Sequence, residues 1–417
     1  MSTAVVLVYP THGHIAPALG VVAELVRRGE RVVFYGTGRA REKIERTGAE
    51  FRLYARRHDA FNPTPPTGGL FSDMERLSAL TEELLPGLLD EVSAAGADYL
   101  LVDTKSLWGR FVGQVLGLPA VTMSVVFGIR PDLISVPELV NHLYGGAPRE
   151  GLLAGLRSLG HYFDICGRMD GHYGTAAPGI IGYLGNPHPL HIIFTSRAFQ
   201  LRGEEFGDDF VFVGPSILPG RDGSCEFPFD RLSKAPLVYI SLGTTFHDAP
   251  EFYQACFAAF GDMPWQVVLS TGGVPADALG TPSNFLVRSY VPQLQLLERA
   301  DVFVTHGGMN SANEGLYHGV PLVVVPQRGD QYLVGARVAE LGAGVTLSPR
   351  QVTAKALRDA VSKLLSEPTY RKAAEVLGES LRDAGGYRRA ANVILERVSA
   401  LREASRQASA ERELAHT

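Results

Sequence analysis

The chain has 417 residues, of which 45% are apolar and 20% charged, and its formal net charge is −5. This length suggests two or three domains, and the composition is that of an ordinary globular protein. The acidic balance disfavours nucleic acid and anionic membranes as the main partner, because both would favour a basic face. Cys166, Cys225 and Cys256 lie far apart, so their spacing predicts neither a disulfide framework nor a zinc site.

The N-terminal stretch MSTAVVLVYP lacks the basic start and long apolar segment of a secretory signal. No uninterrupted apolar run reaches the roughly 18–20 residues that are needed to cross a bilayer. We therefore expect a cytoplasmic protein without a transmembrane segment.

Strands and helices alternate from the start of the chain. A strand is predicted at residues 4–10, AVVLVYP, and a helix at residues 16–29, APALGVVAELVRRG, ending at its last glycine. A second strand follows at residues 31–37, RVVFYGT. Another strand, YLLVD at residues 99–103, precedes a helix at residues 107–119, LWGRFVGQVLGLP. Continuous apolar strands separated by amphipathic helices predict a parallel sheet that is covered on both faces.

The alternation stops at residues 216–236, SILPGRDGSCEFPFDRLSKAP, where proline, glycine and charged residues follow no clear period. Such a composition is typical of an interdomain linker. After it the strand pattern restarts in LVYISLG, WQVVLST, FLVRSY, DVFVTH and PLVVVP. The predicted fold class is therefore α/β, with one doubly wound domain at residues 1–215 and a second at residues 237–385. Ligands of such sheets bind beyond the carboxyl ends of the strands, and two facing domains make a cleft.

Residues 386–417 are predicted to form a C-terminal helix with a polar tail. Ile394, Val398 and Leu401 recur at i, i+4 and i+7, which places them on one helical face. We expect this face to pack against the protein.

The segment THGGMNSANEGLYHGVP, which directly follows the strand DVFV, combines features of a phosphate site. A glycine pair precedes a predicted helix that ends at Gly319, and backbone N–H groups at a helix start bind phosphate where glycines allow close approach. His306 lies at the end of the strand, where its ring can donate to a phosphate oxygen. Asn310 and Ser311 can add side-chain donors, or they can cap the helix.

Neighbouring residues extend this pattern towards a nucleotide sugar. Glu314, one turn beyond Asn310, is expected to accept hydrogen bonds from ribose hydroxyls, since a carboxylate beside phosphate is otherwise unfavourable. Asp330 and Gln331 follow another strand and can bind sugar hydroxyls. Upstream, Tyr290 offers a ring to stack on a base, and Gln293 an amide to contact its edge.

The segment from Tyr290 to Gln331 resembles the nucleotide-sugar signature of the family 1 glycosyltransferases, which include plant glucosyltransferases and bacterial macrolide and flavonoid glycosyltransferases. The two-domain pattern is similar to their GT-B fold, two Rossmann-like domains facing a deep cleft, over essentially the full chain. The resemblance implies these roles by position: base stacking for Tyr290, nucleoside contact for Gln293, diphosphate contact for His306, Gly308, Asn310 and Ser311, ribose binding for Glu314, hexose binding for Asp330 and Gln331, and close approach to phosphate and sugar for Gly243 and Thr244.

The donor implied by this resemblance is UDP-glucose. Tyr290 stands where the family usually has a tryptophan, so it still stacks but with less area. Glu314 favours UDP over dTDP, because a deoxyribose would leave the carboxylate short of a donor, a loss of roughly 1–3 kcal/mol. Asp330 and Gln331 favour glucose, although galactose and other hexoses stay open.

His14 is the expected general base. In the family, the catalytic histidine stands three residues before a proline that suits the first turn of a helix. His14 stands three residues before Pro17, whereas His12 stands five residues before it. Asp103, at the end of its strand, falls where the family has the aspartate that holds the base and stabilises the imidazolium. Asp98 precedes that strand and should lie at the opposite end of the sheet.

We expect a metal-independent reaction, because no Asp-x-Asp motif is present and helix N-termini with His306 can stabilise the leaving UDP. No cofactor is expected, since the UDP-sugar is a co-substrate. Phe61, Trp108 and Phe127 could line an acceptor pocket, or they could belong to ordinary loop and core packing.

The sequence therefore predicts an inverting hexosyltransferase that acts on a hydrophobic macrolide, flavonoid or other phenolic acceptor, as a monomer or homodimer. The main alternative is a dTDP-deoxysugar transferase of antibiotic biosynthesis. A UDP-sugar 2-epimerase and a non-catalytic sugar-nucleotide-binding protein are disfavoured by the combination of His14 and Asp103. A lipid-linked acceptor is disfavoured because the N-terminal half has no basic amphipathic face.

Overall fold

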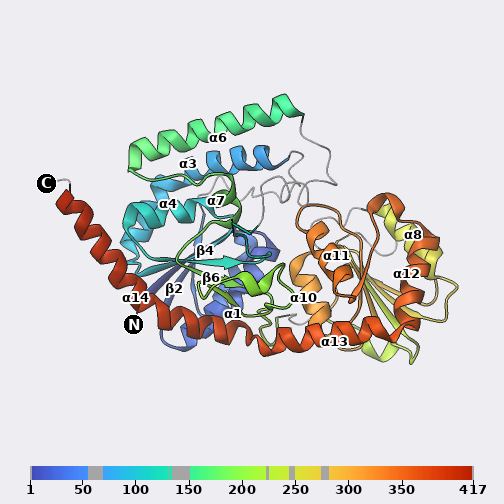
Figure 1. The fold of residues 1–417 in the computed structure, drawn as a ribbon. Helices are drawn as coiled ribbons and strands as arrows, with labels where there is room; N and C mark the ends of the chain where they lie inside the picture. The colour runs from blue at the N-terminus through green and yellow to red at the C-terminus, as the bar shows by residue number, and fades with distance from the viewer. Residues whose placement is uncertain are drawn as a thin grey trace. The chain divides into compact units, whose positions relative to one another are not determined.

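A computed structural model of the chain describes residues 2–54, 69–130, 132–133, 151–221, 225–243, 249–273 and 281–415. The chain divides into two compact units, Met1–Leu218 with Ala384–Thr417, and Pro219–Asp383. Figure 1 labels the helices and strands of both units.

The first unit contains a seven-stranded sheet in the order β3-β2-β1-β4-β5-β6-β7. All its strand pairs are parallel. The strands are β1 (Thr3–Leu7), β2 (Arg31–Gly36), β3 (Glu50–Leu53), β4 (Tyr99–Asp103), β5 (Ala120–Ser124), β6 (Leu190–Ile193) and β7 (Phe210–Phe212). Every residue of β4 and β5 is buried, which explains the continuous apolar runs in the sequence and confirms the predicted parallel sheet.

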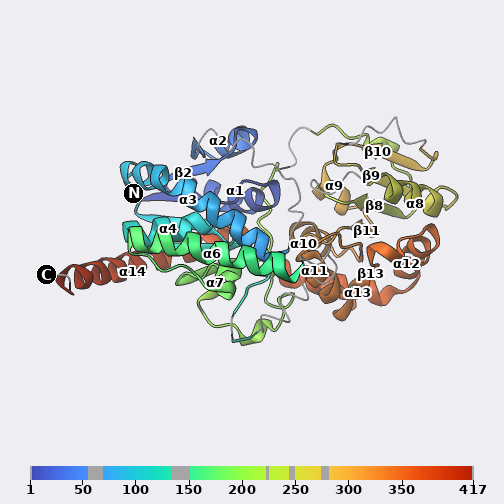
Figure 2. The same cartoon turned by 90° about the horizontal axis from the view of Figure 1, so that it is seen from above.

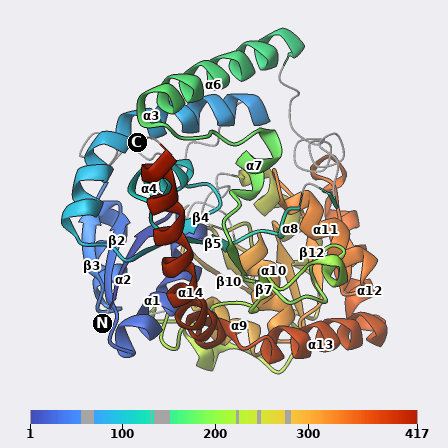
Figure 3. The same cartoon turned by 60° about the vertical axis from the view of Figure 1, so that its left-hand side comes forward.

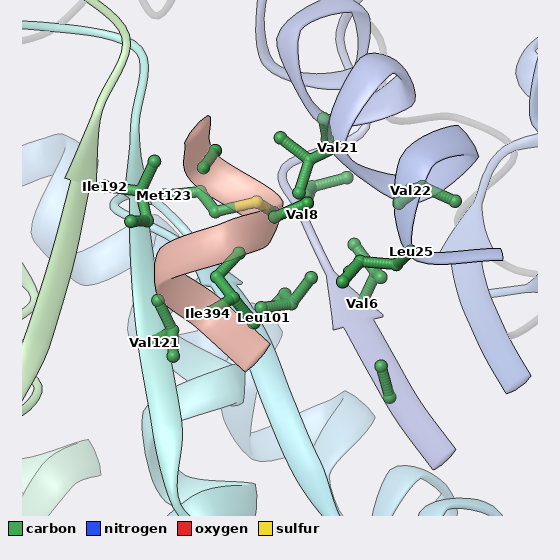
Figure 4. Packing of buried hydrophobic residues seen from close by; sticks show 14 of the residues in the cluster. Val6, Val8, Val21, Val22, Leu25, Leu101, Val121, Met123, Ile192 and Ile394 are labelled. Atoms are coloured by element: carbon green, nitrogen blue, oxygen red, sulfur yellow. The ribbon is translucent and has the colours of Figure 1, made fainter. Parts of the chain in front are cut away.

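Helices cover both faces of this sheet. They are α1 (His12–Arg27), α2 (Arg41–Glu45), α3 (Leu70–Ala94), α4 (Leu107–Leu116), α6 (Leu152–Tyr173), α7 (Ile180–Gly185) and α14 (Gly386–Ala415). Successive β1 residues alternate between two cores: Val6 packs with α1 and α14, whereas Val5 packs with α3 and α4. Figure 4 shows the first of these cores, with Val6 beside Leu25 of α1 and Ile394 of α14. On the other face, α3 and α6 lie side by side (Figure 2).

Helix α14 belongs to the core of the first unit. Ile394 and Val398 are buried in the same cluster as α1, and Leu401 packs against that cluster. Helices α1 and α14 contact each other (Figure 3). They approach closely at Gly20, where a Cβ atom would lie 3.0 Å from the Cβ atom of Tyr387. The predicted packing face of this helix is confirmed.

The second unit contains a six-stranded parallel sheet in the order β10-β9-β8-β11-β12-β13. Its strands are β8 (Leu237–Ser241), β9 (Gln266–Ser270), β10 (Phe285–Arg288), β11 (Val302–Thr305), β12 (Leu322–Val324) and β13 (Gly344–Thr346). Its helices are α8 (Pro250–Phe260), α9 (Gln293–Leu297), α10 (Met309–Tyr317), α11 (Gln331–Glu340), α12 (Ala354–Ser366) and α13 (Pro368–Asp383). One face of the sheet forms a core with α8 and α12. Two doubly wound α/β sheets are therefore present, as predicted.

The boundaries of the units differ from the expected domain boundaries in two places. Residues 219–236, expected as a linker, are part of the second unit, where Arg221 forms an ion pair with Glu314. Helix α14, expected as a separate segment, is part of the first unit because its apolar face completes that core.

Each sheet has one point at which the strand order reverses. In the first unit the chain runs outwards from β1 to β3 and then returns to β4 on the other side of β1. In the second unit it runs from β8 to β10 and returns to β11 beside β8. Ligands of doubly wound sheets bind at this switch point, beyond the carboxyl ends of the strands. In the part of the chain that the structure describes, no helix is long and apolar enough to span a membrane.

Candidate active site

His14 and Asp103 meet at the switch point of the first sheet. Asp103 is the last residue of β4, and His14 lies in the first turn of α1, which follows β1. His14 Nδ1 lies 2.7 Å from Asp103 Oδ2, and the two side chains are 13% and 1% exposed. The predicted rival, Asp98, accepts a hydrogen bond at 2.8 Å from the backbone N–H of Thr3, the first residue of β1, and so lies at the opposite, amino end of the strands. His12 is exposed at the first residue of α1.

The carboxylate of Asp103 is fixed from two sides. Its Oδ1 atom accepts a hydrogen bond from the Lys105 backbone N–H at 2.9 Å, while Oδ2 contacts His14. The Asn186 side chain donates to the backbone carbonyls of Asp103 at 3.1 Å and Ser106 at 3.3 Å. Asn186 ends α7 in the left-handed conformation, which asparagine tolerates better than most residues. Sequence analysis missed Asn186, although the Gly-Asn-Pro triplet is a turn signal.

This contact also fixes the state of the His14 ring. A buried carboxylate accepts a hydrogen from Nδ1, so the neutral ring carries its free lone pair on Nε2. A ring held in this way can take a proton from a hydroxyl group, and the carboxylate stabilises the imidazolium that forms.

The helix that carries His14 begins earlier than expected. The sequence placed Pro17 in the first turn, but α1 begins at His12, so Pro17 lies inside the helix. Backbone N–H groups of His14 and Ile15 donate to the Thr11 carbonyl, which starts the helix at this point. Gly29 follows the end of the helix, as predicted.

The residues expected to line an acceptor pocket are placed differently. Trp108 is 0% exposed, and its Nε1 atom donates to Tyr54 Oη at 3.1 Å. Phe127 is buried against Phe199, with 5.6 Å between ring centroids. Both are buried, Trp108 completely and Phe127 to within 5%, which agrees with core packing, the alternative that the sequence left open. Phe61 lies outside the described residues.

Tyr9, which sequence analysis missed, lies beside the histidine instead. Its ring is half-buried and packs edge-on against His14 with 5.6 Å between centroids. The Lys105 ammonium lies 5.8 Å above the same ring, and Arg76 donates to its hydroxyl at 3.4 Å. The sequence signal that could have identified Tyr9 is its position at the carboxyl end of the first predicted strand.

The switch point of the second sheet holds His306 between glycines. His306 follows β11, and Gly243 follows β8. A Cβ atom at Gly243 would lie 2.7 Å from the His306 ring, and one at Gly308 would lie 2.5 Å from it. Only residues without a side chain fit on either side of this imidazole.

The His306 ring is neutral and has unused hydrogen-bonding capacity. Burial lowers the pKa of His306 to about 4, against a smaller raising effect of a hydrogen bond with the Ser241 backbone. Its Nδ1 atom is buried and has no hydrogen-bond partner among the described residues. A buried polar atom without a partner is costly, so this atom suits a ligand that can supply the missing bond.

Helix α10 begins three residues beyond His306, at Met309. Its N-cap is Gly308, with no side-chain cap and no acidic residue in the first turn. Asn310 and Ser311 therefore do not cap the helix, since they lie inside its first turn. An uncapped helix start presents backbone N–H groups and a partial positive charge to an anion. Thr244, the other residue expected near the phosphate, lies outside the described residues.

The sequence suggested that Glu314 is free to bind a ribose, but the structure gives its carboxylate hydrogen-bond partners within the protein. Arg221 donates to Glu314 Oε1 at 2.6 Å and to Oε2 at 3.0 Å. Gln293 Nε2 donates to Oε2 at 2.7 Å, and Gln293 Oε1 accepts from Tyr239 Oη at 2.9 Å. The expected nucleoside-contacting amide is thus engaged at both ends and supports the carboxylate. Sequence analysis missed Arg221 because it lies in the segment taken as a linker.

Of the remaining predicted residues, Tyr290 and Asp330 keep surface that a ligand could reach, whereas Gln331 is buried. Tyr290 is 60% exposed, and its hydroxyl donates to the Gly272 carbonyl at 3.2 Å, which holds the ring in place. Asp330 is the N-cap residue of α11. The buried Gln331 uses its amide oxygen to accept from the backbone N–H groups of Gln327 and Arg328, so only its Nε2 group can donate to a sugar.

Comparisons with known proteins agree with this arrangement. A profile of the family described as UDP-glucoronosyl and UDP-glucosyl transferase matches residues 219–384. An uncharacterised UDP-glucosyltransferase of Bacillus subtilis, YojK, is 33% identical over 404 residues, covering 95% of this chain and 98% of that protein. The oleandomycin glycosyltransferase of Streptomyces antibioticus is 30% identical over 393 residues, covering 92% and 88%. The crystal structure of the calicheamicin glycosyltransferase CalG4 covers 96% of this chain and 99% of its own, with 27% identity and a TM-score of 0.78.

Proposed function

Because the chain belongs to the UDP-glucosyl transferase family and has the GT-B fold, we propose that it is an inverting transferase that moves glucose from UDP-glucose to a hydroxyl of a hydrophobic natural product. The observation that carries this proposal is the 2.7 Å contact between His14 Nδ1 and Asp103 Oδ2 at the first switch point. A sugar-nucleotide-binding protein without transferase activity has no need of an oriented base at that place.

In the proposed reaction, His14 Nε2 takes the proton of the acceptor hydroxyl as its oxygen attacks the anomeric carbon of the donor. The bond between that carbon and the β-phosphate oxygen breaks, and its electron pair leaves with UDP. Asp103 stabilises the imidazolium. Attack from the face opposite to the leaving group inverts the anomeric configuration.

The second switch point supplies the donor site in this proposal. The start of α10 and the His306 ring meet the diphosphate, and the glycines beside the ring let the phosphate approach closely. Tyr290 stacks on the base, Glu314 accepts from the ribose, and Asp330 with Gln331 Nε2 binds the hexose. The start of α10 and His306 stabilise the leaving charge without a metal ion.

The acceptor class rests on the relatives and on Tyr9. One relative is named as an oleandomycin glycosyltransferase, and a structural neighbour as a calicheamicin glycosyltransferase, which supports a natural-product acceptor. The half-buried ring of Tyr9 beside His14 offers an apolar wall for such a molecule.

The test is turnover of UDP-glucose with a panel of phenolic and macrolide acceptors, in magnesium and in EDTA, with the anomeric configuration of the product read by NMR. We expect a β-glucoside from the α-linked donor at equal rates in both buffers. Formation of an α-glucoside would overturn the inverting mechanism, and loss of turnover in EDTA would overturn metal independence. If calorimetry detects no UDP binding, the donor site itself is wrong.

A further inference from the structure

Glu314 already accepts three hydrogen bonds from the second unit. Its Oε1 atom accepts one from Arg221, and its Oε2 atom accepts one from Arg221 and one from Gln293. A carboxylate offers about four lone-pair sites, two on each oxygen. Among the residues that the structure describes, these bonds saturate Oε2 and leave one site on Oε1.

The Arg221 pair is well suited to stay in place when a nucleotide binds. The guanidinium holds the carboxylate with two parallel bonds, and the side chains of Arg221 and Glu314 are 17% and 5% exposed. Neutral ribose hydroxyls cannot replace the positive charge, so removing the guanidinium would leave a buried carboxylate uncompensated beside a diphosphate.

Gln293 is equally committed to its position. Its Oε1 atom accepts from the Tyr239 hydroxyl, so the Nε2 group must point towards Glu314. Tyr239 is buried and stacked on Phe303, with 4.7 Å between ring centroids and an interplanar angle of 7°. The donor set around Glu314 is therefore anchored in the sheet.

We infer that Arg221 and Gln293 leave Glu314 able to accept only one ribose hydroxyl, so that this protein binds 2′-deoxyribonucleoside diphosphates nearly as well as ribonucleoside diphosphates. The 3′-hydroxyl, which both kinds of nucleotide carry, fills the remaining site on Oε1. Arg221 is thus a specificity-determining residue that acts through Glu314. The inference rests on the proposed function, because it places the ribose at this carboxylate. It reverses the expectation that Glu314 selects UDP over deoxyribose donors.

The test compares UDP with dUDP by titration calorimetry of the full chain. These ligands differ in the 2′-hydroxyl alone, whereas dTDP also adds a methyl group to the base. We expect dUDP to bind within about fivefold of UDP. A carboxylate that needed both hydroxyls would instead lose a charge-assisted hydrogen bond, worth about tenfold or more in affinity. A ratio above about fivefold in the unmodified protein overturns the inference.

The variant Arg221→Met removes two of the three donors while keeping an unbranched apolar stem in their place. We expect UDP to bind more weakly and the preference for UDP over dUDP to rise to about tenfold or more, because Glu314 then depends on both hydroxyls. Adding Glu314→Gln to Arg221→Met should bring the ratio back below about fivefold. An unchanged ratio in Arg221→Met overturns the role of the arginine.

Arg358→Met is the matched control. Arg358 also forms an ion pair in the second unit, with Asp262 at 2.6 Å, but it lies on α12 against α8. In Arg358→Met, the ratio of UDP affinity to dUDP affinity should equal that of the unmodified protein. Circular dichroism verifies that all variants are folded. Tight UDP binding with strong rejection of dUDP overturns this inference alone. Failure to bind either ligand overturns the proposed donor site and the inference with it.

Discussion

His14 and His306 both follow a strand at the switch point of their sheet, yet the protein holds their rings in different ways. Nδ1 of His14 contacts a buried carboxylate, whereas the His306 ring is enclosed by glycines and its Nδ1 atom has no partner in the part of the chain that the structure describes. The first arrangement prepares a ring to gain a proton. The second keeps a ring neutral, because burial lowers the pKa of His306 to about 4.

This difference shows that the partner of a histidine, and not its place in the fold, determines what it can do. A neutral ring stabilises an anion through one hydrogen bond and adds no charge. The start of α10 adds positive potential to the second site. The negative charge of Glu314 does not oppose it, since Arg221 compensates that charge.

The largest effect should come from breaking the His14–Asp103 pair. We expect His14→Ala to lower kcat by about 10³-fold or more, since general base catalysis and orientation of the ring are lost together. Asp103→Asn should lower kcat by about 10²-fold or more, because an amide cannot stabilise the imidazolium. UDP affinity, measured by calorimetry, should stay within about twofold in both variants. Near-normal turnover of His14→Ala would show that the base is a different group.

The second effect concerns histidines that are buried and neutral in both units. Burial lowers the pKa of His191 to about 4, as it does for His306. Unfolded chains bind these protons near pH 6.5. The contribution of each neutral histidine to the free energy of unfolding is therefore fully present above about pH 6.5. It is lost as the pH falls towards 4, by about 2–3 kcal/mol per histidine. Urea unfolding at pH 7.5 and pH 4.5, followed by tryptophan fluorescence, measures this loss.

His191→Phe identifies the contribution of one such ring. His191 stacks on Phe210 with 4.1 Å between ring centroids, and a phenyl ring can keep that stacking. The variant should lose less stability between pH 7.5 and pH 4.5 than the unmodified protein. Equal losses would mean that His191 is not the group that titrates. Glu24→Gln is a control, because Arg27 and Arg28 lower the pKa of Glu24 to about 2, and its stabilising effect is lost only below about pH 4.5.

The smallest effect should come from filling the space beside His306. Gly308→Ala places a Cβ atom 2.5 Å from the ring, at a backbone φ of −59° that alanine accepts. We expect the ring to shift and UDP affinity to fall about tenfold, with kcat at saturating donor less affected. Gly160→Ala on α6 meets nothing within 4 Å and should leave UDP affinity unchanged. Unaltered UDP binding in Gly308→Ala would remove His306 from the donor site.

Much of the fold could be predicted from the sequence because parallel strands are buried on both faces. The run YLLVD coincides with β4, and the strand that precedes His306 coincides with β11 apart from its first residue and the histidine itself. Since all strands point the same way, residues at their ends gather at one edge. That rule is enough to bring His14 to Asp103.

The residues that sequence analysis missed act over long distances in the chain. Arg221 is separated from Glu314 by 93 positions, and Asn186 is separated from Asp103 by 83. The periodicity of residues within one helix or strand cannot indicate pairs that lie so far apart in the sequence. Trp108 was ambiguous for the same reason, since an aromatic residue at a helix start fits a pocket or a core equally well. Its hydrogen bond to Tyr54, 54 positions away, places it in the core.

Helix α14 completes the core of the first unit, although it is the last helix in the sequence. Ala390, Ala391, Ile394 and Val398 are buried against α1, although all of the second unit precedes them in the sequence. During synthesis, domains generally fold as units in the order in which their residues emerge. The second unit is one continuous segment and can close its core while α1 still lacks its cover. The unit that carries His14 is therefore the last to reach its final packing, although its first strand leaves the ribosome before any other.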